Sequence, residues 1–241
     1  MTDTLDFLIL IGRPASGKSE IIDFIKHLPA GICREKYHLG ELDILDDFPM
    51  LWTWFEEDAL LSQRFNRPRL HTDEEGYFIH QDLWHLLIER IEMDYNKRQR
   101  DDADYHQRYS TLIEFSRGSQ HGGYAAAFSH FSDELLKRAV VLYVNVPFEE
   151  SLRKNRLRYN PKRPDSILEH GLPDEKMERL YRLDDWQVFS QPDPDFLHVR
   201  ELLIPYSVFE NGDDVTTAKT GLLASRLESN LQHLWHLRHK Q

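Results

Sequence analysis

The feature that most constrains this chain is an eight-residue loop near its start. The loop matches the pattern G-x-x-x-x-G-K-[ST] at every fixed position and reads Gly12-Arg13-Pro14-Ala15-Ser16-Gly17-Lys18-Ser19. Residues 7–11 before it are continuously apolar, which is typical of a strand buried on both faces of a parallel sheet. The apolar residues after it recur at helical spacing, at Ile21, Ile22, Ile25 and Leu28. The loop is therefore expected to join a buried strand to a helix, which is the context that this pattern requires.

A loop of this kind binds phosphate groups mainly through its backbone. Its N–H groups turn inward around the phosphates, and the helix N-terminus adds partial positive charge. Gly12 and Gly17 permit the bend and the close approach of the backbone to a ligand. Lys18 can reach the β- and γ-phosphates, and the Ser19 hydroxyl can ligate Mg²⁺. The sequence therefore predicts a nucleotide-binding site to which all eight loop residues contribute.

The composition favours a folded protein and argues against nucleic acids and membranes as partners. The chain has 30 Lys and Arg residues against 41 Asp and Glu residues, which gives a net charge of −11. Such a charge makes general nucleic-acid binding unlikely, because that binding relies on neutralising phosphates. The longest apolar run, residues 7–11, is far shorter than the ~20 residues that span a bilayer. The start of the chain lacks the pattern of a signal peptide and Cys33 has no disulfide partner, so we expect a cytoplasmic protein without membrane contact.

Apolar segments alternate between short runs rich in β-branched residues and longer helical stretches. Further strands are expected within residues 37–45, 111–115, 139–146 and 206–209, and a long amphipathic helix after residue 214. This alternation predicts an α/β fold, a three-layer α/β/α sandwich around a mainly parallel five-stranded sheet. Residues 1–241 are expected to form one domain, with a helical insertion at 46–108 and a lid-like segment at 153–195.

The opening of the chain resembles that of P-loop kinases of the nucleoside/nucleotide and small-metabolite type, within the P-loop NTPase superfamily. The resemblance is carried by Asp6-Phe7-Leu8-Ile9-Leu10-Ile11 together with the loop, and later features are similar in order and kind. It implies transfer of the γ-phosphoryl group of ATP to a small acceptor, with Mg²⁺. GTPases fit poorly, because the segment Asn96-Lys97-Arg98-Gln99 lacks the final Asp of their base-reading N-K-x-D motif.

The resemblance also implies roles for two residues after the third strand. Glu114 follows apolar strand residues as in a Walker B motif, where it would hold Mg²⁺ together with Ser19. Arg117 stands where related nucleotide kinases place an arginine on the acceptor or on the transferred phosphate. The alternative is that Glu114 and Arg117 are surface residues beside a loop.

Clustered arginines follow the fourth strand, after a proline and an acidic helix start. This arrangement resembles the run into the lid of such kinases, where arginines bind phosphate oxygens when the site closes. Arg153 and Arg156 are the first candidates, with Arg158 and Arg163 as reserves. The alternative is a solvated basic helix face, paired with acidic neighbours.

Carboxylates near the end of the second strand are candidates for the acceptor side. Ligands of open α/β sheets lie outside the carboxyl ends of the strands, where Asp43, or second Asp46, could orient an acceptor hydroxyl and take its proton. In the insertion, Trp52 could stack on an acceptor ring and Arg64 could hold an acceptor phosphate. An ordinary acidic loop and a core tryptophan remain alternatives.

The turn after the fifth strand contains Asn211 and Gly212. In similar kinases this loop contacts the adenine, often through backbone atoms, so these two residues are expected to contact the base. A plain helix cap explains them as well.

Three functions are open at this point. The first is an ATP-dependent kinase of a small acceptor such as a nucleoside, nucleotide or sugar-like metabolite. The second is a P-loop protein that binds or hydrolyses ATP and engages a protein partner through the 46–108 insertion. The third is a polynucleotide 5′-kinase, which the acidic composition disfavours. Homodimerisation, the acceptor and the choice between ATP and GTP stay open.

Overall fold

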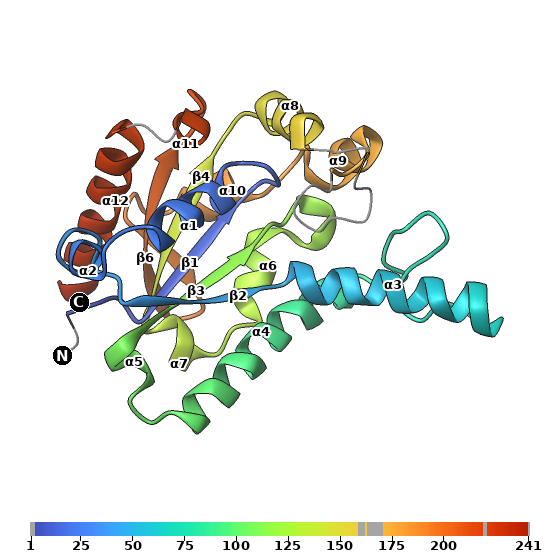
Figure 1. Ribbon diagram of the computed structural model, residues 1–241, viewed down its shortest axis with the longest axis horizontal. Helices are drawn as coiled ribbons and strands as arrows, with labels where there is room; N and C mark the ends of the chain where they lie inside the picture. Colours follow the sequence, from blue (N-terminus) through green and yellow to red (C-terminus); the bar gives the residue numbers. More distant parts are fainter. Residues whose placement is uncertain (1–2, 159–161, 163–170, 219–220, 241) are drawn as a thin grey trace.

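The fold is built on a six-stranded sheet with the order β2-β3-β1-β4-β6-β5 (Figure 1). A computed structural model describes residues 3–158, 162, 171–218 and 221–240. The strands are β1 (Phe7–Gly12), β2 (Glu41–Asp46), β3 (Tyr109–Phe115), β4 (Ala139–Asn145), β5 (Phe196–Val199) and β6 (Leu202–Glu210). All neighbours pair in parallel except β5 and β6. The predicted α/β/α sandwich is confirmed, and its loop lies at the end of a central strand.

The central strands are apolar along their whole length because both of their faces are covered. Every residue of β1 is buried, and alternate side chains enter opposite core layers. Phe7, Ile9 and Ile11 pack on one side of the sheet. Leu8 and Leu10 pack on the other. This double burial fixes β1, and with it the loop, at the middle of the sheet.

Helices cover both faces of the sheet (Figure 1). One layer contains α1 (Lys18–Lys26), α2 (Ala30–Tyr37), α11 (Val215–Ala218) and α12 (Gly221–His239). The other contains α4 (Asp82–Asp101), α5 (Tyr105–Arg108), α6 (Gly123–Ser129), α7 (Asp133–Leu136) and α10 (Trp186–Ser190). The expected C-terminal helix is α12, which buries the leucine stripe Leu223, Leu227, Leu231, Leu234 and Leu237. Among the described residues, no helix combines the length and the apolarity that crossing a bilayer requires.

The structure differs from the sequence prediction in three elements. The sheet has a sixth strand, β5, which forms a hairpin with β6 through Arg200 and Glu201. Arg200 has φ +53°, and this turn lacks the Asn or Gly that usually marks such a hairpin. Pro29 followed by Gly31 predicts the end of the first helix, but α1 ends earlier, at Lys26, and Pro29 instead precedes α2 as its N-cap. The sequence pattern of residues 175–189 predicts one short helix, but the structure divides this stretch into α9 (Asp174–Tyr181) and α10.

The segment 46–108 is helical, and its first helix, α3 (Phe48–Phe65), extends away from the sheet, whereas α4 and α5 pack on the sheet (Figure 1). The buried carboxylate of Asp58 on α3 accepts hydrogen bonds from the backbone of Leu70, His71 and Thr72 at 2.6–3.0 Å. These bonds fix the loop between α3 and α4 against α3.

The segment 153–195 begins within α8 (Phe148–Arg158) and contains α9 and α10. Phe148 on α8 packs against Met177 and Tyr181 on α9 in a small apolar cluster of its own. This cluster places α8 and α9 above the carboxyl ends of β1 and β4.

Candidate active site

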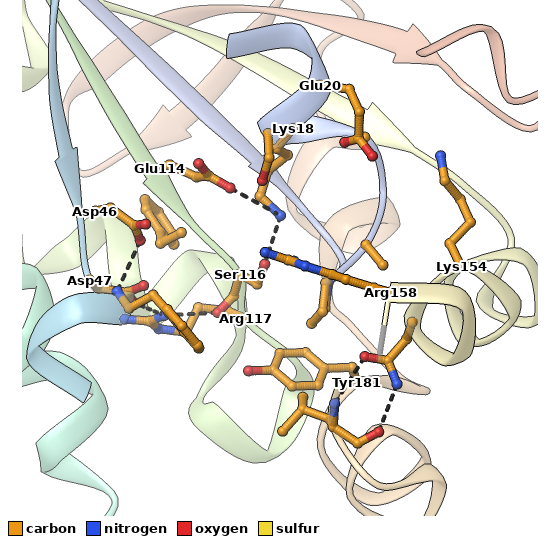
Figure 2. A pocket seen from close by; sticks show the side chains of 18 of the residues that line it. Lys18, Glu20, Asp46, Asp47, Glu114, Ser116, Arg117, Lys154, Arg158 and Tyr181 are labelled. Atoms are coloured by element: carbon orange, nitrogen blue, oxygen red, sulfur yellow. Dashed lines mark hydrogen bonds and ion pairs between the residues drawn. The ribbon is translucent and has the colours of Figure 1, made fainter. Parts of the chain in front are cut away.

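A cleft of about 610 Å³ lies at the carboxyl ends of the parallel strands. The loop after β1, the ends of β2 and β3, helix α8 and Tyr181 of α9 all line it (Figure 2). Five loop residues face this cleft: Pro14, Ala15, Gly17, Lys18 and Ser19. The site thus lies where ligands of open α/β sheets bind.

The shape of the loop depends on glycine at two positions. Gly12 has φ +155° and Gly17 has φ +111°, which non-glycine residues rarely adopt. A Cβ atom on Gly17 would lie 2.5 Å from the Asn211 amide nitrogen, and one on Gly12 would lie 2.6 Å from the Val144 carbonyl oxygen. Ala15 also has positive φ, +56°. The two fixed glycines of the motif are therefore required by the backbone and its neighbours.

Lys18 is buried beneath the loop and bonds to the loop itself. Its Nζ donates to the carbonyl oxygens of Gly12 and Arg13 at 3.2 and 3.0 Å, and to Ser116 Oγ at 2.9 Å. Burial lowers the pKa of this ammonium group, while nearby Glu114 opposes that shift. Ser16 Oγ is buried in the same loop and has no hydrogen-bond partner among the residues described. A curled backbone, an ammonium group and a spare hydroxyl fit an anionic phosphate group.

Asn211 supports the loop from behind and does not line the cleft. Its side chain is fully buried, and its Nδ2 donates to the Ser16 carbonyl at 2.7 Å and to Thr216 Oγ1 at 2.9 Å. Gly212 follows on the same side, 3.7 Å from Pro147 for an added Cβ, and is likewise absent from the cleft lining. The Asn211 side chain therefore braces the loop, and the contact of these two residues with the base stays a prediction.

The side chain of Arg13 also points away from the cleft. Its guanidinium donates to the carbonyls of Tyr181 and Val146 at 3.2 Å each, and lies 2.7 Å from Asp184 Oδ2. Arg13 was expected to bind nucleotide, but its side chain instead joins the loop to the segment between α9 and α10. Burial raises the pKa of Asp184, and the Arg13 charge opposes this effect.

Three carboxylates gather on the side of the cleft facing Lys18. Asp46 ends β2 directly opposite Glu114 of β3, and Asp47 follows (Figure 2). Burial and the charges of Asp47 and Glu114 raise the pKa of Asp46 to about 7. Burial also raises the pKa of Glu114, whose Oε1 lies 3.9 Å from Lys18 Nζ. This side of the cleft can therefore hold a proton near neutral pH.

The fit of this site to Mg²⁺ can be judged from its donors. Ser19 and Glu114 both line the cleft, so hydroxyl and carboxylate oxygens, which Mg²⁺ prefers, lie in one cavity. In the part of the chain that the structure describes, no three His, Cys, Asp or Glu side chains are arranged so that they could hold a metal ion by themselves. Such a site suits an ion that keeps several waters and takes further oxygens from a bound phosphate.

Asp43 does not lie in the cleft. It occupies the middle of β2, opposite Thr111, and its carboxylate pairs with Arg98 and accepts from the Tyr105 hydroxyl. The residues that line the cleft from this strand are Asp46 and Asp47. The first choice for a proton-accepting carboxylate is thus wrong in position, and the second choice, Asp46, lies at the site.

Arg117 lines the cleft but is only 1% exposed. Its Nη1 contacts Asp47 Oδ2 at 2.5 Å, and its Nη2 donates to the Trp84 carbonyl at 3.0 Å. Its Nε is buried and has no partner among the described residues. Arg117 therefore stands in the wall of the cleft, fixed by Asp47.

The arginine side chains of α8 point in different directions. Arg156 forms a forked ion pair with Asp174 at 2.6–3.1 Å and lies outside the cleft lining. Arg153 lines the cleft, but pairs with Glu150 and Asp214. Arg158 extends into the cleft toward Lys18 and Ser116 (Figure 2). The reserve candidate Arg158 therefore points toward the loop, whereas the first candidate Arg156 does not. Arg163 falls outside the described residues.

A second cavity of about 430 Å³ adjoins the cleft on its α3 side. The two cavities share part of their walls, namely Phe48, Leu51, Trp84, Leu172 and Tyr181. Trp52 lines the second cavity and its indole nitrogen donates to Glu56 Oε1 at 2.8 Å. Arg64 lies exposed near the far end of α3 and lines neither cavity, so the structure does not bring it together with the other acceptor-side candidates.

Sequence reasoning missed most of the second cavity. Its walls combine α3, the loop around Gly76, the start of α4, the turn at His121 and α9. Trp52 and Phe55 gave a signal as aromatic residues in a helical insertion, but the turn at His121 and α9 are far from them in the chain, and nothing in the sequence joined them to this cavity.

A comparison with protein-family models finds no match, and neither does a comparison with curated protein sequences. Among solved structures, the chain is similar to a shikimate kinase from Acinetobacter baumannii in complex with shikimate, at 16% identity and a TM-score of 0.41. That alignment covers 92% of this chain and 95% of the kinase. A sugar kinase from a Janibacter species is similar at 14% identity and a TM-score of 0.41, over 95% of each chain. The fold of this chain is assigned from its own strand order and phosphate-binding loop.

Proposed function

We propose that the chain is an ATP-dependent phosphotransferase that phosphorylates a small acceptor. The observation that carries this proposal is the pair of adjoining cavities. One is lined by the phosphate-binding loop, and the other has the volume of a small-molecule site. The two cavities share five lining residues, namely Phe48, Leu51, Trp84, Leu172 and Tyr181. A phosphoryl group bound at the loop would therefore face an acceptor bound next to it, and transfer is mainly a matter of such positioning.

The nucleotide side of the reaction is assigned to the loop, with ATP as the donor. Backbone N–H groups of residues 12–19 would hold the phosphates, and Lys18 would exchange its present bonds to loop carbonyls for phosphate oxygens. Ser19 and Glu114 would hold Mg²⁺, which when bound neutralises charge on the phosphates. Arg158 would add a forked cation from the α8 side.

The acceptor side is assigned to Asp46 and Arg117. Asp46 has a pKa of about 7, so it can take the acceptor's hydroxyl proton near neutral pH. Arg117 would hold the oxygens near the point of transfer, provided that the Asp47 contact yields to them. Trp52 and the other residues of the second cavity would bind the rest of the acceptor.

The two rival functions would require features that differ from those of this chain. A protein that engages a partner through residues 46–108 would present a flat surface there, whereas the insertion contributes to a concave cavity that opens on the cleft. A polynucleotide 5′-kinase would need a channel lined by basic residues, and the net charge of −11 disfavours such a channel. These observations favour a small acceptor.

The test is a screen for acceptor-dependent formation of ADP. Nucleosides, nucleotides, sugars and other alcohols are offered with ATP and Mg²⁺, and phosphorylated product is identified by mass spectrometry. At least one acceptor should raise turnover well above basal hydrolysis, and Lys18→Ala should abolish both. If Lys18→Ala removes basal hydrolysis while no acceptor stimulates the unaltered protein, the ATP-hydrolysing rival is correct instead.

A further inference from the structure

The second cavity has walls made mainly of aromatic rings, and we call it the aromatic cavity. Seven of its lining residues are aromatic: Phe48, Trp52, Phe55, Tyr77, Phe78, Trp84 and Tyr181. Leu51, Leu172, Pro173 and Leu180 add further apolar surface. None of the described residues that line it carries a carboxylate. Its 430 Å³ falls within the size range of sites for small organic ligands.

The rings in this cavity are held in place by one another. Phe78 packs against Trp84 with ring centroids 4.7 Å apart, and against Phe55 at 6.0 Å. Trp84 in turn stacks on His121 at 3.8 Å. Side chains fixed in this way present ring faces at little further entropic cost when a ligand binds.

One buried polar atom in the cavity wall has no partner. His121 is 1% exposed, and its Nδ1 accepts a hydrogen bond from the Gly118 N–H at 3.2 Å. Burial and the Arg117 charge lower the pKa of His121 to about 3, so the ring is neutral and its proton lies on Nε2. Nε2 is buried without a hydrogen-bond partner among the described residues. A buried N–H left unpaired is costly, and because His121 lines the cavity, a ligand whose ring nitrogen or carbonyl oxygen reached Nε2 would remove that cost.

The two cations of the cavity are engaged with its own wall. Lys176 Nζ donates to the Gly76 carbonyl at 3.0 Å, and the Arg179 guanidinium lies 4.0 Å from the centre of the Tyr77 ring. Gln81 and Gln120 complete the polar lining. Seven rings face this small polar set, so a polyhydroxylated acceptor would bury several of its hydroxyl groups against ring surface, and each hydroxyl left unpaired costs free energy.

We propose that the aromatic cavity binds a planar heteroaromatic ring of the acceptor, with a ring nitrogen or carbonyl oxygen accepting from His121 Nε2–H. The inference rests on the proposed phosphotransferase function and names its acceptor class. The ring lies between the aromatic side chains, and the alcohol of the same molecule extends past Tyr181 and Trp84 toward Asp46. Nucleosides and hydroxymethyl-substituted heteroaromatic compounds share this chemistry, whereas sugars and cyclic polyols do not.

The experiment measures binding by calorimetry, independently of turnover. Uridine, adenosine and pyridoxine represent the two heteroaromatic sources, and glucose and shikimate represent the polyols; each is titrated into the full chain with a non-hydrolysable ATP analogue and Mg²⁺. At least one heteroaromatic compound should bind, and the polyols should bind at least tenfold more weakly. Whichever of the two sources binds identifies the ring type.

Two variants locate the bound compound. Phe55→Ala removes a ring that lines only the aromatic cavity, and binding should weaken about tenfold. Leu60→Ala on the same helix removes an exposed side chain, 46% accessible, that lines neither cavity, and it should leave binding unchanged. His121→Phe keeps a ring in place and removes the N–H donor, and should weaken binding to a similar extent. Thermal melting confirms that each variant is folded.

The outcomes separate this inference from the proposed function. Binding and phosphorylation of a polyol, without binding of any heteroaromatic probe, overturns the inference and leaves the phosphotransferase function standing. Binding of a heteroaromatic probe that is sensitive to Phe55→Ala but never phosphorylated supports the cavity assignment and counts against the function. Equal weakening by Phe55→Ala and Leu60→Ala would also overturn the inference.

Discussion

Asn211 Nδ2 donates a hydrogen bond to the Ser16 carbonyl at 2.7 Å, so a side chain from the end of β6 holds the phosphate-binding loop from behind. The same nitrogen reaches Thr216 Oγ1 at 2.9 Å. A loop that must present backbone N–H groups to a ligand cannot satisfy all of its carbonyl groups internally. Asn211 supplies one of the missing donors.

Asn211→Ala should weaken both the fold and nucleotide binding. It leaves the Ser16 carbonyl and Thr216 without their partner in a buried position, which costs about 1–3 kcal/mol. Denaturant unfolding and titration with an ATP analogue measure the two effects. Asn230→Ala removes an amide that bonds Ser207 and Arg226 in the α12 region, and should alter stability alone. Equal nucleotide affinity in both variants would contradict the bracing role.

Arg158→Ala should lower the turnover number by about 10³-fold or more, since a cation that neutralises the transferred phosphoryl group has an effect of that size. The dissociation constant of the nucleotide should change far less. Steady-state kinetics with the acceptor found in the screen gives the turnover number. Arg156→Ala is the matched control, because Arg156 lies on the same helix and pairs with Asp174 outside the cleft. A larger loss in Arg156→Ala than in Arg158→Ala would reverse the assignment.

The pKa of about 7 at Asp46 predicts two opposite dependences on pH. Turnover should rise as the pH increases through 7, because a proton acceptor must first lose its own proton. Stability should fall as the pH rises from about 4 to 7, because the folded state binds the Asp46 proton more tightly than the unfolded chain does, and this advantage disappears above the folded-state pKa.

Asp46→Asn separates these effects. It resembles the protonated form, so it should raise the melting temperature at pH 8, change it little at pH 5, and abolish acceptor-dependent turnover. Asp43→Asn serves as a comparison, because Asp43 lies outside the cleft, bound to Arg98 and Tyr105. A pH profile of turnover that Asp46→Asn leaves unchanged would exclude Asp46 as the proton acceptor.

Arg13→Ala should destabilise the chain through Asp184. Removing the guanidinium leaves a carboxylate whose side chain is 7% exposed without its ion-pair partner, at a cost of about 3 kcal/mol. For a chain of this size the melting temperature should fall by roughly 6–12 °C. The double variant Arg13→Ala/Asp184→Asn should recover part of the loss, because it removes the buried charge. No recovery would mean that the bonds from Arg13 to the Tyr181 and Val146 carbonyls dominate.

The loop and the sheet could be predicted because their signals are local. The motif specifies glycine at two of the loop's positive-φ positions, Gly12 and Gly17, and the apolar runs of β1 and β4 record burial on both faces. The hairpin of β5 and β6 lacked a local signal, because Arg200 rather than glycine adopts positive φ at its turn. The fold prediction was therefore right in architecture but missed the edge strand β5.

The errors in the site have a common physical cause, which is that long-range contacts decide where a side chain points. The pairing of β2 with β3 sets Asp46 opposite Glu114 at the strand end, and leaves Asp43 in the middle of the strand. The bond from Ser151 to the Pro14 carbonyl, 2.7 Å, fixes α8 against the loop and contributes to turning Arg156 outward. Arg64 lies roughly 25 Å along α3 from its first residue, a distance that follows only once the helix is known to be continuous.

The shared wall of the two cavities implies that their ligands are thermodynamically linked. Trp84 and Tyr181 belong to both linings, so filling one cavity alters the surroundings of the other. If the ligand of one cavity changes the affinity of the other ligand by some factor, the second ligand must change the affinity of the first by the same factor. If the two cavities hold donor and acceptor as proposed, both ligands would be bound together, and the phosphoryl group would pass directly between them without a covalent intermediate on the protein.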